Sequence, residues 1–142
     1  MYRVLIPVGE HTNRALAAAE AASALPNAAD AVSAVVLNVF EEFEVTGEAG
    51  TVNSEDVWDE TAYPASVDAV VDHLEAAGVT TATRREHGDV TKQILAVADE
   101  IDADAIVMGG RKRSPTGKVL FGSTTQSVML SAERPVTVSI RE

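Results

Sequence analysis

Asp104-Ala105-Ile106-Val107-Met108-Gly109 is a short apolar run that ends in glycine, and Gly110-Arg111-Lys112-Arg113 follows it directly. An uninterrupted apolar run of this length is typical of a strand that is buried on both faces of a parallel sheet. The stretch therefore predicts a central strand over 105–108, followed at its carboxyl end by a loop rich in glycine and basic residues.

Four other segments have strand character, and helical patterns lie between them. The strands are expected at 2–8, 34–39, 79–87 and 135–140. The first helix is expected at about 13–25, with Thr12 as its cap, and the second contains the apolar stripe 67–74 and ends at Gly78. The third helix is expected after its cap Asp89. The fourth begins at Ser123, which forms a capping box with Gln126. This alternation predicts an α/β fold: a five-stranded, parallel, doubly wound, Rossmann-like sheet in strand order 3-2-1-4-5 with four helices.

Composition restricts the classes of function. The chain has 142 residues, which suits a single domain over 1–142, and 46% of them are apolar. It has no cysteine, which excludes disulfide frameworks and thiolate metal sites. No segment has the length of a membrane span and the N-terminus does not resemble a signal peptide, so we expect a cytoplasmic protein.

The charge is strongly negative, with 22 acidic against 11 basic residues and a net charge of -11. Such a chain repels nucleic acids and anionic lipid, so neither is expected as a partner. The acidic surface serves either solubility alone or adaptation to concentrated salt, as in halophilic proteins. Many of the acids fall in 41–60, which we expect to form a long acidic loop that Trp58 attaches to the body, with a lid as the alternative.

The loop after strand 105–108 has the features of a phosphate site. Four of the 11 bases, Arg111, Lys112, Arg113 and Lys118, lie within eight residues of one another. The helix that begins at Ser123 adds free N–H groups and a positive dipole end. The alternative is that the bases balance the acidic loop and the glycines serve the turn. The pattern does not match a Walker A loop, because Gly117-Lys118 is followed by Val119.

These residues resemble the universal stress protein family over essentially the whole chain, from "VLIPV" near the start through Gly88-Asp89 and "DAIVMG" to "RPVTVSI". The family's nucleotide motif is a glycine, two residues, a glycine, nine residues, a glycine and a serine or threonine. Gly109 and Gly122-Ser123 match it at the right distance, whereas Lys112 stands at the middle glycine.

The resemblance implies an ATP site, with Mg²⁺ arriving on the nucleotide, and a homodimer formed along strand 135–140. Pro7, Val8 and Val39 would flank the adenine. The residues implied around the ribose and phosphates are Met108, Gly109, Arg111, Lys112, Gly122, Ser123 and Thr124.

Two positions depart from the family pattern. Gly9 stands where the family's ATP binders usually carry an aspartate, so recognition of the nucleoside would need Glu10 or His11 in compensation. Lys112 either adds a charge to a phosphate oxygen or fills the space that a phosphate would need.

The sequence therefore favours an ATP-binding stress regulator with a protein partner of unknown identity. A nucleotide-independent, dimeric scaffold of the same fold is the alternative. A slow ATPase is disfavoured because no general base or acidic metal pair faces the loop, and no catalytic residue or metal ligand is assigned.

Overall fold

The computed structural model describes residues 1–40, 64–111 and 122–141. The elements follow one another along the chain as β1 (Tyr2–Pro7), α1 (Thr12–Ser23), α2 (Ala28–Ala31), β2 (Val32–Phe40), α4 (Ala65–Ala76), β3 (Thr80–His87), α5 (Val90–Glu100), β4 (Ala105–Arg111), α6 (Ser123–Ser131) and β5 (Val136–Arg141). The expected acidic loop at 41–60, with Trp58, lies outside the described residues.

The five strands form one sheet in the order β3-β2-β1-β4-β5, and every pair is parallel. This confirms the predicted doubly wound sheet and its strand order. Successive strands are added on one side of β1 as far as β3 and on its other side from β4 onward, so the strand order reverses between β1 and β4. The carboxyl ends of these two strands flank the crevice where ligands bind in such folds.

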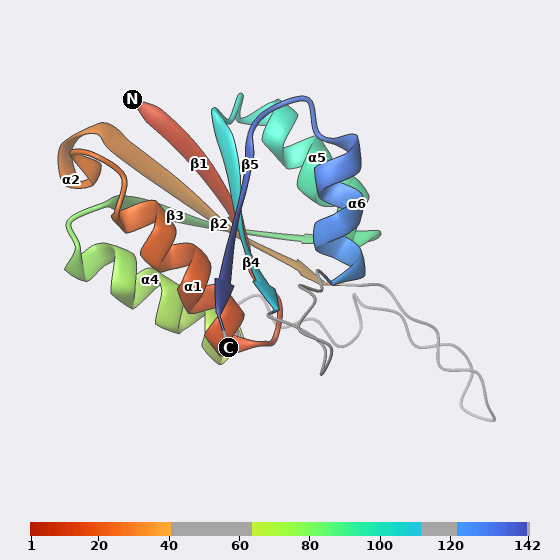
Figure 1. The fold of residues 1–142 in the computed structure, drawn as a ribbon, viewed down its shortest axis with the longest axis horizontal. Helices are drawn as coiled ribbons and strands as arrows, with labels where there is room; N and C mark the ends of the chain where they lie inside the picture. Colours follow the sequence, from red (N-terminus) through yellow and green to blue (C-terminus); the bar gives the residue numbers. More distant parts are fainter. Residues whose placement is uncertain (41–63, 112–121, 142) are drawn as a thin grey trace.

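Helices cover both faces of the sheet (Figure 1). Helices α1 and α4 pack on one face, where their apolar side chains meet those of Val4, Ile6 and Val36. Helices α5 and α6 cover the other face around Leu5, Leu37 and Ile106. Because both faces are covered, β1, β2 and β4 are buried apolar runs, as parallel sheets require.

The prediction of four helices was wrong, because the described residues contain five. The additional helix α2 is a single turn of four residues that follows Asn27 in the left-handed conformation (φ 55°). One turn is too short to give a helical periodicity in the sequence, so no helix was predicted for this segment.

Several predicted boundaries differ by a few residues, and two predicted helix caps are wrong. Strand β4 continues through Gly109 and Gly110 to Arg111, because β5 extends far enough to pair with all three residues. Helix α6 takes Gly122 as its N-cap, so Ser123 lies inside the helix and the predicted capping box does not form. Likewise His11 occupies the N-cap position of α1, and Thr12 is the first residue of the helix and not its cap.

Candidate functional site

The loop between β1 and α1 is held by hydrogen bonds from two neighbouring elements. The Val8 amide donates to the Leu37 carbonyl oxygen at 2.8 Å, and the Asn38 side-chain amide donates to the Val8 carbonyl oxygen at 3.1 Å. One residue further, the Ser66 hydroxyl donates to the Gly9 carbonyl oxygen at 2.5 Å. The loop at the carboxyl end of the central strand therefore has a fixed path.

Asn38 and Ser66 hold this loop from the core. They are 5% and 1% exposed, and Asn38 Oδ1 is buried without a hydrogen-bond partner among the described residues. A buried amide and a buried hydroxyl are costly unless they are hydrogen-bonded, so their contacts with the loop stabilise its position.

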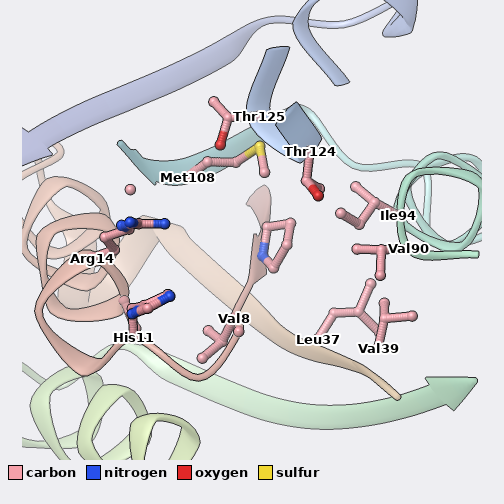
Figure 2. A pocket seen from close by; sticks show the side chains of 14 residues that line it. Val8, His11, Arg14, Leu37, Val39, Val90, Ile94, Met108, Thr124 and Thr125 are labelled. Atoms are coloured by element: carbon pink, nitrogen blue, oxygen red, sulfur yellow. The ribbon is translucent and has the colours of Figure 1, made fainter. Parts of the chain in front are cut away.

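A pocket of about 270 Å³ opens beside this loop, at the carboxyl ends of β1, β2 and β4. Residues from three helices complete its walls (Figure 2). The lining residues are Pro7, Val8, Gly9, His11, Arg14, Ala15, Leu37, Val39, Val90, Ile94, Met108, Gly109, Thr124 and Thr125. The volume is close to the lower limit for sites that enclose a small organic ligand.

The pocket has an apolar side and a basic side. Leu37, Val39, Val90 and Ile94 lie on one side, and His11 and Arg14 of α1 lie on the other (Figure 2). Thr124 and Thr125, from the first turn of α6, provide hydroxyl groups between the two. Among the described lining residues none is acidic. The arrangement suits a ligand that has an apolar ring and a negative charge.

Two helices begin at this pocket without side-chain caps. The N-cap of α1 is His11, whose side chain accepts no hydrogen bond from the helix, and the N-cap of α6 is Gly122, which has no side chain. In α5, by contrast, the Asp89 carboxylate accepts a hydrogen bond from the Lys92 amide at 3.0 Å. The uncapped amides of α1 and α6 add positive potential at the pocket.

The predicted site residues fall into two groups. Seven of them line the pocket: Pro7, Val8, Gly9, Val39, Met108, Gly109 and Thr124. Gly122 and Ser123 lie at the start of α6, next to Thr124 in sequence but outside the lining. Arg111 is the last residue of β4, and Lys112 lies outside the described residues.

Sequence reasoning missed Arg14, Ala15, Leu37, Val90, Ile94 and Thr125. Arg14 carried a signal, because it is a base in the first turn of a helix that has no acid there. A cation at that position is disfavoured by the helix dipole, so its presence indicates that the side chain interacts with a group outside its own helix. Val90 and Ile94 gave no such signal, since their spacing is that of an ordinary buried helix face.

The described residues contain no group of three or more His, Asp or Glu side chains able to hold a metal ion. In the same ranges, no helix combines the length and the apolar character that crossing a membrane requires.

Comparison with known proteins gives one consistent result. The model of the universal stress protein family matches residues 1–139. A curated universal stress protein from Mycolicibacterium smegmatis is 40% identical over 65 residues, which cover 45% of this chain and 50% of the relative. The matched part thus spans about half the length of that relative.

Many solved structures share the fold, among them two from Archaeoglobus fulgidus. A universal stress protein from Archaeoglobus fulgidus is 26% identical, with a TM-score of 0.72 and 98% of each chain covered. The structure of the Archaeoglobus fulgidus universal stress protein in complex with dAMP is 20% identical, with a TM-score of 0.69 and the same coverage of both chains.

Proposed function

Because the chain belongs to the universal stress protein family, we propose that its pocket binds an adenine nucleotide and that the bound state regulates a stress response. The observation that carries the proposal is a pocket, at the switch point of a doubly wound sheet, that has an apolar side opposite a basic side. The dAMP complex of the Archaeoglobus fulgidus protein supports a nucleotide ligand in this fold.

The proposed ligand is ATP. Its base would lie against Val39 and Val90, and its phosphates would extend towards Ser123 and Thr124 at the uncapped start of α6. Arg111 and Lys112 follow in sequence from Gly109, so they enter the proposal as further phosphate ligands. Mg²⁺ would arrive on the phosphates and keep most of its waters.

A nucleotide-independent scaffold is the second candidate. Gly9 favours it, because the loop at the pocket supplies no carboxylate for the hydroxyl groups of a ribose. In that case the basic side of the pocket would contact an acidic segment of a protein partner.

Isothermal titration of ATP with Mg²⁺ in concentrated potassium chloride tests the proposal, with AMP and GTP as comparators. We expect saturable binding of ATP at micromolar concentration and weaker binding of GTP. The absence of both heat and a thermal shift at millimolar concentrations of all three would overturn nucleotide binding and favour the scaffold.

We further propose that the protein works in the cytoplasm as a homodimer joined along β5. This strand is at one edge of the sheet, and Ile140 on it is 38% exposed. An apolar edge strand invites pairing with a second copy. Light scattering should give the mass of a dimer, and Ile140→Lys should give a monomer. Thr80→Lys on the opposite edge strand is the control and should remain dimeric.

A further inference from the structure

The basic side of the pocket is formed by one turn of α1. His11 is the N-cap of this helix and Arg14 is its third residue, so both side chains reach the pocket from the same turn (Figure 2). Long side chains on a helix lean towards its N-terminus, and this direction carries the Arg14 guanidinium over the carboxyl end of the sheet.

The backbone of Arg14 is fixed in place, and its side chain has no ionic partner among the described residues. Its carbonyl oxygen lies against Gly109 so closely that a Cβ at position 109 would come within 1.9 Å of it. No hydrogen bond or ion pair joins the guanidinium to another described residue. A half-buried arginine near the positive end of a helix is disfavoured by the helix dipole, and a bound anion would offset this penalty.

The other walls of the pocket indicate which part of a nucleotide would carry the anionic group that faces Arg14. The apolar side, with Val39, Val90 and Ile94, is suited to a base, and the start of α6, with Thr124, is suited to a 5′-phosphate. The pocket of about 270 Å³ is near the lower limit for sites that enclose a small organic ligand, which suits one nucleoside. The part of the nucleoside left to face Arg14 is the edge of the ribose that carries the 2′- and 3′-oxygens.

We infer that this pocket selects a nucleotide whose ribose carries a second phosphate, at the 2′- or 3′-position, and that Arg14 and His11 hold this phosphate. In dinucleotide-binding folds an acidic residue binds a free ribose, whereas an arginine accommodates a ribose phosphate. Here the described lining has the arginine and no acid. The planar guanidinium can donate two parallel hydrogen bonds to one phosphate. The inference rests on the proposed nucleotide-binding function.

Calorimetric titration of the full chain with AMP, adenosine 2′,5′-bisphosphate and adenosine 3′,5′-bisphosphate tests the inference. We expect one of the two bisphosphates to bind about tenfold tighter than AMP or better, the gain typical of a hydrogen-bonded ion pair. Arg14→Gln should remove most of this preference. The control Arg3→Gln removes the same charge at the opposite end of β1 and should keep the preference. Circular dichroism and melting curves establish that each variant is folded.

The outcomes separate the inference from the proposed function. Equal affinities for AMP and both bisphosphates in the unaltered protein would overturn the inference and leave nucleotide binding intact. If Arg14→Gln lowers the affinity for all three ligands equally, Arg14 binds the 5′-phosphate, which also overturns the inference. No binding of any of the three would overturn both the inference and the proposed function.

Discussion

Gly109 on β4 lies directly against the backbone of Arg14 on α1. A Cβ built at position 109 would be 1.9 Å from the Arg14 carbonyl oxygen and 2.6 Å from its carbonyl carbon. The absence of a side chain at 109 lets α1 approach the end of β4, and this approach holds Arg14 at the pocket. Gly109 therefore has a packing role in addition to its place in the pocket wall.

Gly109→Ala should destabilise the fold, because the added methyl group can be accommodated only if α1 moves away from the sheet. Overpacking of this kind costs about 1–3 kcal/mol, to be measured by urea unfolding. Gly9→Ala is the matched control, since a Cβ there has no other heavy atom within 4 Å. Equal stability of Gly109→Ala and the unaltered protein would contradict the close packing.

Gly9→Asp should strengthen the binding of nucleotides that have a free ribose. The position has room for the side chain, and the Gly9 carbonyl is already held by Ser66. A carboxylate that accepts hydrogen bonds from ribose hydroxyls should improve the affinity for AMP by about tenfold, measured by calorimetry. Gly9→Asn is similar in shape but uncharged, so it should give a smaller gain. Unchanged affinity in Gly9→Asp would place the ribose elsewhere.

The sheet was predictable because burial on both faces gives each central strand a continuous apolar run, as at Ala105–Met108. The cap of α5 was predictable for a similarly local reason, since Asp89 bonds an amide three residues away. The start of α6 at Ser123 was predictable as well, but the residue that caps it was not. Gly122 takes the extended N-cap conformation (φ -62°, ψ 160°), whereas a serine followed by Gln126 satisfies the capping-box pattern in sequence alone.

Some residues of the candidate site were predictable from the sequence and others were not. Residues that end strands, such as Val8, Val39 and Met108, were predictable because topology brings the carboxyl ends of parallel strands together. Arg14 and Ile94 reach the pocket from helices, and which face a helix turns to the pocket depends on how it packs on the sheet. For α1 that packing depends on a tertiary contact, the one between Gly109 and Arg14, which no local pattern reveals.

The ion pair between Arg84 on β3 and Glu100 at the end of α5 should contribute to the pH dependence of stability. The hydrogen bond from Arg84, and then its charge, lower the pKa of Glu100 below the ordinary value of 4.5. A carboxyl group whose pKa is lower in the folded state stabilises the fold above the unfolded pKa. This contribution is lost as the pH falls through the folded value.

Glu100→Gln should therefore lower the melting temperature slightly at neutral pH and make it fall less steeply below pH 4.5. The effect is small because Glu100 is exposed and salt screens the pair, so melting curves should be recorded at low ionic strength. The exposed Glu75, which makes no ion pair with another described residue, provides the control variant Glu75→Gln. Parallel pH curves for the unaltered protein and Glu100→Gln would show that the pair contributes nothing.

The net charge of -11 leads to a prediction about salt. The described surface includes like charges one helical turn apart, as at Asp68 and Asp72 on α4, and such pairs destabilise a helix. Because the screening length falls from about 10 Å at 0.1 M salt to about 3 Å at 1 M, the melting temperature should rise with potassium chloride over this range. Asp72→Lys replaces the repulsion with an attractive pair to Asp68. It should raise the melting temperature at low salt and reduce the further gain at high salt. A melting temperature that falls as potassium chloride increases would contradict salt adaptation and leave solubility as the role of the acidic surface.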